Sequence, residues 1–250
     1  MRHSACLASA AVIASLLSAS TLAQSTDDDL RIYAVNVVKT PPFEKQFTGY
    51  GIYLGQGIVI TAAHVVGHWP FFTHPRVLIA GQDLPAKVIK EGSFETTDLA
   101  LLSVDEAKLS ISLRLRRNPV CNRSPSIGTE VIDVVPEGTT RARVISPLSI
   151  IPQLRKRFDS LIDSVKASGS GLFDAERKCL LGIVSARVQK YHYQLENVRI
   201  RGYADGYAGY FVSAATIAKF IPSDLHLELP KPRQSQYPIE DSSLLNPGAK

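Results

Sequence analysis

The stretch Ile58-Val59-Ile60-Thr61-Ala62-Ala63-His64-Val65-Val66 combines an apolar β-strand with a histidine at its end. Its β-branched residues predict a buried strand over residues 57–63. His64 follows two small alanines and has no like-charged neighbour, a setting that suits a neutral imidazole able to take a proton near pH 7. We therefore expect His64 to act as a general base whose partners lie elsewhere in the chain.

Short β-rich segments separated by turn residues recur along most of the 250 residues. Segments this frequent indicate an all-β barrel or sandwich rather than alternating strands and helices. A polar, turn-rich break at residues 118–125 divides the chain into two halves, at about 30–118 and 124–212. The expected strands lie at residues 30–38, 47–54, 57–63, 77–79, 86–89 and 99–104, and then at 130–135, 140–146, 180–188 and 210–212.

Three segments of the second half predict something other than a strand. Residues 155–165 carry apolar residues at a spacing that predicts a helical turn or an irregular loop. Residues 202–209 are rich in Gly and Tyr and predict a loop. Residues 214–221 predict the one clear helix, with Ser213 as its N-cap.

The two ends of the chain have a composition unlike the rest. Arg2 precedes an uncharged apolar run at residues 5–17, and small residues follow at 21–23, which is the pattern of a secretory signal peptide over residues 1–23. The run is too short for a membrane span, which takes about 20 residues. We expect a secreted or periplasmic protein without a membrane span, ending in a flexible polar tail at residues 222–250.

Charge and cysteine content narrow the possible partners and the compartment. The formal net charge is +5, and it becomes +4 without the leader because Arg2 is the one base there. The basic residues are scattered and not interleaved with aromatic residues, so no nucleic-acid partner is expected. Cys121 and Cys179 remain after the leader is removed. In an oxidising compartment they favour a disulfide, with two buried free thiols as the alternative.

Two later stretches contain the groups that a histidine base needs for acyl transfer by a serine. A carboxylate must hold the imidazole in one tautomer, and a serine must give up its proton to that imidazole. Asp98 directly precedes an apolar strand, where a carboxylate can be half buried. Ser168 lies among small residues, where the backbone can approach a substrate closely. We predict His64 as base, Asp98 as its orienting group and Ser168 as nucleophile.

These motifs resemble those of the trypsin-like (chymotrypsin-fold) serine proteases, especially the compact secreted bacterial members. Thr61-Ala62-Ala63-His64 matches the histidine motif of that family, and residues 98–102 (DLALL) match its aspartate motif. Residues 168–173 (SGSGLF) resemble its serine motif, and 182–185 (GIVS) the strand that binds the substrate backbone. The resemblance covers about residues 47–221. It implies two packed antiparallel six-stranded β-barrels with the catalytic residues in the cleft between them.

The serine motif departs from the family pattern at two positions before the nucleophile. Lys166 stands where the family has glycine, and Ala167 stands where Asp or Asn is usual. The backbone N–H of residue 166 is an expected oxyanion donor, and a side chain there can forbid the backbone angle that aims it. The register also leaves an alternative, because counting from residues 164–165 selects Ser170 as nucleophile in place of Ser168.

The substrate-binding residues are expected around the serine and on the strand that follows it. Lys166, Ser185 and Arg187 are the predicted substrate-binding residues, with Ile162 or Asp163 lining the pocket. Because Arg187 is followed by the basic Lys190 and by His192, we predict an acidic side chain at the cleaved position.

A metal site and a cofactor are not expected. His64 and His68 are four residues apart, but Val65 stands where a zinc protease needs a glutamate.

The predicted function is that of a serine endopeptidase acting on a protein or peptide substrate. Two alternatives stay open: a catalytically impaired homologue that binds peptides or proteins, and a basic envelope-binding β-protein. The sequence does not determine the oligomeric state.

Overall fold

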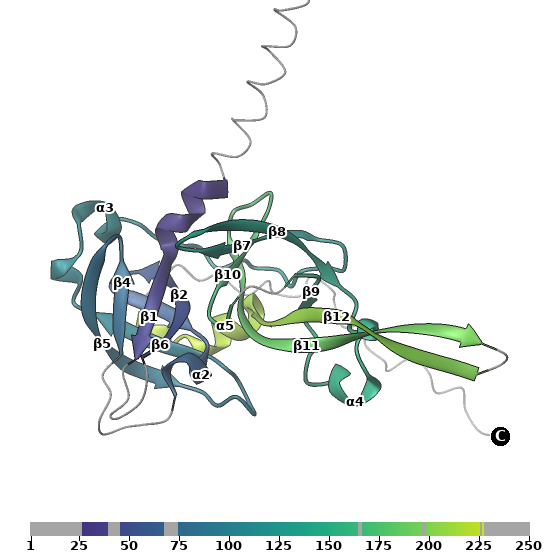
Figure 1. Cartoon of the computed structure of the whole chain (residues 1–250). Coiled ribbons are helices and arrows are strands. Elements are labelled where there is room, and N and C mark those ends of the chain that lie inside the picture. The colour runs from purple at the N-terminus through teal and green to yellow at the C-terminus, as the bar shows by residue number, and fades with distance from the viewer. Residues whose placement is uncertain are drawn as a thin grey trace, which may run out of the picture.

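The structure is a computed structural model that describes residues 27–39, 46–67, 75–164, 167–196, 199–225 and 227. The predicted signal peptide and nearly all of the predicted tail lie outside these residues. The chain forms two closed antiparallel β-barrels of six strands each, which lie side by side (Figure 1). The predicted all-β, trypsin-like architecture of two six-stranded barrels is confirmed.

The first barrel has the strand order β1-β2-β3-β6-β5-β4, and β1 closes it by pairing with β4. Its inward face is apolar, with Val35, Val59 and Leu102 among the fully buried side chains. The strands are β1 (Ala34–Lys39), β2 (Phe47–Gly55), β3 (Ile58–Thr61), β4 (Arg76–Ile79), β5 (Gln82–Glu91) and β6 (Ala100–Val104). The short helices are η1 (Asp29–Tyr33) and α2 (Ala63–Val66), followed by η2 (Glu106–Lys108) and α3 (Ile111–Arg114) after the barrel.

The second barrel has the order β10-β11-β12-β9-β8-β7 and is closed by the pairing of β10 with β7. Its strands are β7 (Glu130–Val135), β8 (Gly138–Ile145), β9 (Leu161–Ile162), β10 (Gly171–Asp174), β11 (Leu180–Glu196) and β12 (Arg199–Ser213). Its helices are η3 (Pro147–Ser149), α4 (Pro152–Arg155), α5 (Ala214–Phe220) and η4 (Ser223–Leu225).

One apolar core joins the two barrels. Ile52, Ile60 and Leu101 of the first barrel belong to the same buried cluster as Leu172 and Ile183 of the second. Burial of such side chains contributes about 1.5–3 kcal/mol each, so this shared core holds the two barrels together.

The predicted C-terminal helix is present as α5 and returns to the first barrel. Lys90 of β5 donates a hydrogen bond to the backbone oxygen of Phe220 at 2.6 Å, and its ammonium lies 4.7 Å from the centre of the Phe220 ring. Ser213 stands at the N-cap position, but its side chain makes no capping hydrogen bond. Ser213 is thus the N-cap residue, as predicted, and its hydroxyl lies 3.5 Å from the hydroxyl of Thr216.

The predicted disulfide between Cys121 and Cys179 is present, with a Cα–Cα distance of 5.1 Å. It joins the connection between the barrels to the turn before β11. The same connection is held by hydrogen bonds, since the Cys121 N–H donates to the Leu180 oxygen at 2.9 Å and the Leu180 N–H to the Pro119 oxygen at 2.9 Å.

The predicted loop at residues 202–209 is wrong, because this segment belongs to β12. It pairs with β11 as one side of a long hairpin that projects from the second barrel (Figure 1). The glycine content has a different role: the register shifts between Gln189 and Tyr191, and Gly206 opposite the shift has φ +70°. A β-bulge of this kind accommodates an extra residue without ending the strand. We call residues 189–207 of this hairpin the arm; residues 197–198 at its tip lie outside the described residues.

The predicted helical turn or loop at residues 155–165 is partly a strand. The helical turn α4 lies earlier, and residues 161–162 form β9, which pairs with both β8 and β12. These two residues are fully buried, so closing the barrel outweighs the local spacing of apolar residues.

Candidate active site

His64 lies in the helical turn α2 that directly follows β3. The strand ends at Thr61, and Ala62 is still extended, so β3 ends two residues before the predicted end of this strand. The backbone N–H of His64 donates to Oδ1 of Asp98 at 2.9 Å, and its Nδ1 lies 2.7 Å from Oδ2 of the same carboxylate. Two contacts with one carboxylate hold the imidazole in a single orientation, with its side chain 30% exposed.

Asp98 is a buried carboxylate two residues before β6, with a side chain only 3% exposed. Burial raises the pKa of Asp98, but the hydrogen bonds from the His64 ring, the Ser185 hydroxyl and the His64 backbone outweigh this effect and hold the pKa below its ordinary value. The Ser185 hydroxyl donates to Oδ2 at 2.5 Å. Asp98 is therefore charged at neutral pH and able to orient the imidazole.

Ser168 lies in a tight turn, residues 167–170, which we call the serine loop. The Ser170 N–H donates to the Ala167 oxygen at 3.2 Å, and the Gly169 N–H donates to the Val184 oxygen at 2.8 Å. Ser168 is half-buried, and its hydroxyl donates to the backbone oxygen of Ser185 at 3.2 Å. Among the described residues no hydrogen bond joins this hydroxyl to the His64 ring.

Ser170, the alternative nucleophile, has no access to substrate in this structure. Its side chain is fully buried, and its hydroxyl has no hydrogen-bond partner among the described residues. Its backbone oxygen accepts from the Val184 N–H at 2.9 Å, which joins the serine loop to β11. The burial of Ser170 favours Ser168 as the nucleophile.

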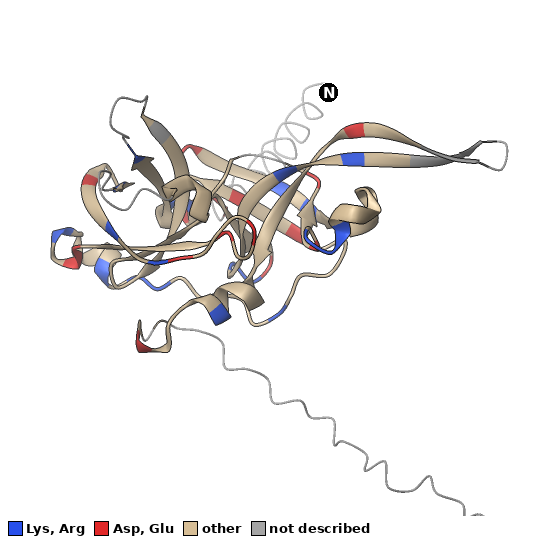
Figure 2. Cartoon of the chain, turned by 90° about the horizontal axis from the view of Figure 1, so that it is seen from below, with Lys and Arg blue, Asp and Glu red and all other residues tan. Residues whose placement is uncertain are grey.

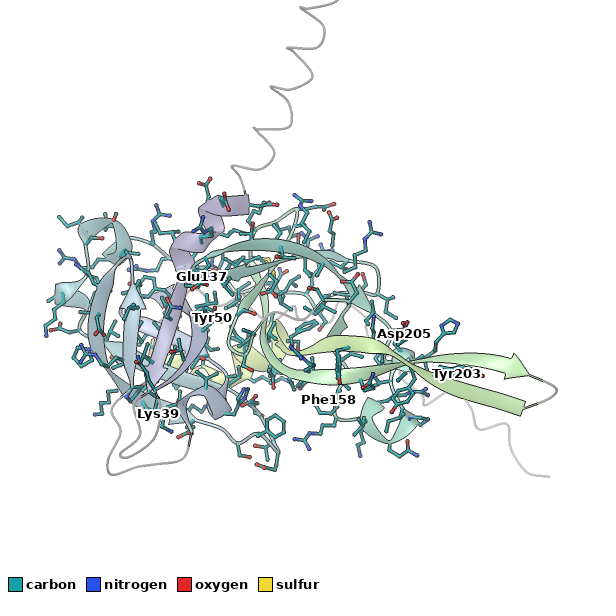
Figure 3. The ribbon with its side chains drawn as sticks, in the orientation of Figure 1. Lys39, Tyr50, Glu137, Phe158, Tyr203 and Asp205 are labelled. Carbon is teal, nitrogen blue, oxygen red and sulfur yellow. A yellow bond between two sulfur atoms is a disulfide. The ribbon has the colours of Figure 1, made fainter. Side chains whose placement is uncertain are left out.

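The first barrel holds the serine loop through the backbone of Tyr50. The Tyr50 N–H donates to the Ser168 oxygen at 3.1 Å, and the Thr61 hydroxyl donates to the Tyr50 oxygen at 2.5 Å. The Tyr50 hydroxyl faces Glu137, which comes from the β7–β8 turn of the second barrel (Figure 3). Burial and this carboxylate raise the pKa of Tyr50. Tyr50 thus connects the serine loop with both barrels.

Phe94 lies over His64 and is held by the second barrel. Its ring makes an edge-on contact with the imidazole, at 5.9 Å between ring centres. The Arg157 guanidinium lies 4.7 Å from the centre of the Phe94 ring and donates to the Phe94 oxygen at 3.0 Å. It also lies 5.3 Å from the ring of Phe158, which is labelled in Figure 3. Phe94 and His64 line the same small pocket.

The three predicted substrate-binding residues lie in different surroundings. Ser185 is buried. Its hydroxyl donates a hydrogen bond to Asp98, and its backbone oxygen accepts one from the Ser168 hydroxyl. Arg187 is exposed at the root of the arm, and its guanidinium lies 5.4 Å from the centre of the Tyr207 ring. Lys166 lies outside the described residues.

The two pocket residues differ in exposure. Ile162 is fully buried in β9. Asp163 is exposed, and its carboxylate accepts a hydrogen bond from the Arg143 N–H at 2.8 Å.

Sequence reasoning missed the hydrogen bond from the Ser185 side chain to Asp98 and the roles of Tyr50 and Phe94. A hydroxyl inside the apolar run of residues 180–188 was a usable signal for Ser185, since a buried polar group requires a partner. No local signal marked Tyr50, because its role depends on the position of β2 against the serine loop.

Within the described residues there is no group of three or more His, Cys, Asp or Glu that could hold a metal ion. His68 lies outside them. No helix of the described part is both long enough and apolar enough to cross a membrane.

No protein-family model and no curated protein matches the chain. Solved structures do match it. The Rv3671c protease from M. tuberculosis in its active form is 19% identical with a TM-score of 0.54, covering 77% of this chain and 81% of that chain.

Kallikrein-related peptidase 10 is 16% identical with a TM-score of 0.51, covering 78% of this chain and 96% of the other. The HtrA-type protease AlgW, solved with a tripeptide, is 18% identical with a TM-score of 0.51, covering 76% and 58%. At these identities the likeness concerns the fold alone, which is that of the trypsin-like serine proteases.

Proposed function

We propose that this chain, which has the trypsin-like serine protease fold, is a secreted serine endopeptidase with His64, Asp98 and Ser168 as its catalytic residues. The observation that carries the proposal is the hydrogen-bond network around Asp98. His64 and Ser185 both contact its carboxylate, and the Ser185 backbone accepts from Ser168. Base, orienting group and nucleophile therefore belong to one connected site, in which His64 contacts Asp98 directly and Ser168 is joined to Asp98 through Ser185.

In the proposed reaction the Ser168 hydroxyl leaves the Ser185 oxygen and gives its proton to Nε2 of His64 as Oγ attacks the scissile carbonyl. The backbone N–H of Ser168, and that of Lys166, are the expected donors to the oxyanion. The C–N bond then breaks, and the imidazolium gives its proton to the leaving amine. Water deprotonated by His64 hydrolyses the acyl-serine and restores the enzyme.

A fluorophosphonate probe tests this assignment directly. We expect one adduct per chain on Ser168, lost in Ser168→Ala and in His64→Ala, and retained in Ser170→Ala as the matched control. Peptide turnover should fall by about a million-fold in either of the first two variants. An adduct on Ser170 would contradict the assignment of the nucleophile.

The second candidate is a catalytically impaired homologue that binds peptides. The observation that favours it is the Ser168 hydroxyl, which hydrogen-bonds the Ser185 oxygen rather than the imidazole. Lys166 and Ala167 in place of the family residues point the same way. A folded sample that gives no adduct on any serine would support this candidate.

Secretion and cleavage preference are further parts of the proposal. Export should remove residues 1–23, so N-terminal sequencing of the mature chain should begin at Gln24.

A panel of fluorogenic peptides should show preference for an acidic residue at the cleaved position. A preference for basic or apolar residues would contradict the role predicted for Arg187.

A further inference from the structure

The short helix α3 presents two apolar side chains to solvent. Ile111 and Leu115 are 67% and 75% exposed, the highest values among the large apolar residues of the described part. They are four residues apart, so they lie on the same face of a helix. Leu113, which comes between them, is buried in the core of the first barrel. Residues two apart on a helix point in nearly opposite directions, so the burial of Leu113 leaves Ile111 and Leu115 outside.

Hydrogen bonds at both ends hold α3 in this orientation. At its start, the side chain of Ser110 accepts from the Leu113 N–H at 3.4 Å. At its end, Nη1 of Arg117 donates to the backbone oxygens of Arg114 at 2.6 Å and of Arg116 at 2.8 Å. The exposure of the apolar pair is therefore a property of a capped, anchored helix.

The stretch of chain that contains α3 is basic. Residues 105–129 carry two acidic residues, both before residue 107, and five basic ones, a net charge of +3. The acidic residues are Asp105, which lies 3.9 Å from Lys108, and Glu106. Arg114 and Arg116 flank Leu115 and form no ion pair among the described residues. Elsewhere acidic and basic residues are interspersed over both barrels (Figure 2).

An anionic lipid bilayer is the partner that fits this combination of apolar and basic side chains. Protruding apolar side chains can enter the boundary between headgroups and acyl chains without a matched pocket. Neighbouring guanidinium groups can bind the lipid phosphates while their stems stay among apolar atoms. Figure 1 shows α3 at the outer edge of the first barrel, on the side away from the arm. The predicted export of the chain brings it to a membrane.

We propose that α3 docks the protein on anionic lipid bilayers, with Ile111 and Leu115 inserted among the headgroups and Arg114 and Arg116 bound to lipid phosphates. Two apolar side chains and two bases give a weak, reversible attachment and not a permanent anchor. The proposal goes beyond the proposed function and does not depend on it, because none of these residues belongs to the candidate active site.

The test measures how residues 24–250 partition onto sedimented vesicles, since the apolar run at residues 5–17 would itself enter a bilayer. Vesicles containing phosphatidylglycerol are compared with vesicles of phosphatidylcholine alone. We expect a partition coefficient at least about tenfold higher on the anionic vesicles. It should fall as salt is added, because salt screens the attraction between exposed charges. Equal partitioning onto the two kinds of vesicle would overturn the proposal.

Variants separate the apolar from the basic contribution. Ile111→Ser/Leu115→Ser should lower the partition coefficient on anionic vesicles by at least about tenfold, and Arg116→Gln by about fivefold. The matched control is Leu148→Ser, because Leu148 is 65% exposed but lies in η3 of the second barrel, where its oxygen accepts from Arg155. This control should partition as the unmodified chain does. An equal loss in the control would overturn the assignment to α3.

Sedimentation velocity without lipid tests whether α3 binds a second copy of the chain instead. We expect the same sedimentation coefficient for the unmodified chain and for Ile111→Ser/Leu115→Ser. Self-association that disappears in this variant would overturn lipid docking in favour of an interface between copies. The fluorophosphonate adduct is a separate readout: vesicle binding without an adduct would contradict the enzyme assignment alone, and an adduct without vesicle binding would contradict the docking surface alone.

Discussion

Asp98 is the residue on which the candidate site depends, since it accepts hydrogen bonds from both His64 and Ser185. A carboxylate this deeply buried stays charged only while donors compensate for its lost hydration. Ser185 supplies one such donor from the second barrel, whereas His64 and Asp98 belong to the first. The charge state of Asp98 therefore depends on how the barrels are packed against each other.

Ser185→Ala should raise the pKa of Asp98, because one of the donors that lowers it is removed. We expect peptide turnover to fall by about tenfold to a hundredfold, the loss of one hydrogen bond to a charged group. Activity should also disappear at a higher pH on the acid side than in the unmodified protein. The matched control is Ser213→Ala, whose hydroxyl has only a 3.5 Å contact with Thr216. An unchanged acid limit in Ser185→Ala would contradict this role.

Gly169 is required by the backbone of the serine loop. Its φ is +87°, and a Cβ at this position would overlap the backbone oxygen of Tyr50. Gly169→Ala should lower the free energy of unfolding by about 3 kcal/mol or more, through strain and overpacking together. Gly81→Ala is the control, because Gly81 also has a positive φ of +78° but a Cβ added there would meet no atom within 4 Å. It should cost only about 1–2 kcal/mol in denaturant unfolding.

Among the elements, η1 at the N-terminal end of the described chain ties the first barrel to the second. Asp27, two residues before it, accepts from Lys178 at 2.5 Å and from Arg141 at 2.9 Å. Arg31 donates to the Pro136 oxygen at 2.7 Å in the β7–β8 turn. Residues 27–33 are thus fastened to the second barrel, although the strand β1 that follows them belongs to the first.

Asp27→Asn should weaken this attachment in a pH-dependent way. Burial raises the pKa of Asp27, but Lys178 and Arg141 outweigh it and lower the pKa below its ordinary value. The carboxylate therefore stabilises the fold at neutral pH, and this contribution is lost as the pH falls below about 4.

The free energy of unfolding of the variant should be about 1–2 kcal/mol lower at pH 7. This loss lies between the losses typical of exposed and of buried ion pairs. In unfolding titrations the difference should disappear at acid pH. Asp28→Asn is the control, because the Asp28 carboxylate is exposed and lies 3.9 Å from Arg31. A difference that persists at low pH would mean that Asp27 acts through packing rather than charge.

At the scale of the whole molecule, the disulfide between Cys121 and Cys179 constrains the connection between the barrels. It closes a loop with a sequence separation of 58, which the chain-entropy model values at about 4 kcal/mol. The double variant Cys121→Ser/Cys179→Ser should lose about that much free energy of unfolding. The unmodified protein should have the same free energy of unfolding as this double variant only after its disulfide has been reduced. Equal stability of the oxidised and reduced protein would contradict this contribution.

The alternation of apolar and polar residues and the turn residues between them were sufficient to predict most strands and the two halves. These features are local, since the side chains of a strand alternate between its two faces with a period of two residues. The arm was missed because its glycines are typical of a loop when β12 is read without β11. Pairing across the hairpin is a long-range property, and it outweighs local preference.

The sequence by itself predicted candidate residues for acyl transfer and determined that they belong to an all-β chain. Only the tertiary structure decided that Ser170 is buried while Ser168 is accessible, that Ser185 supports Asp98, and that α3 leaves Ile111 and Leu115 exposed. The physical reason is that burial and hydrogen bonding depend on contacts between segments far apart in the chain. No short stretch of sequence contains both partners of such a contact.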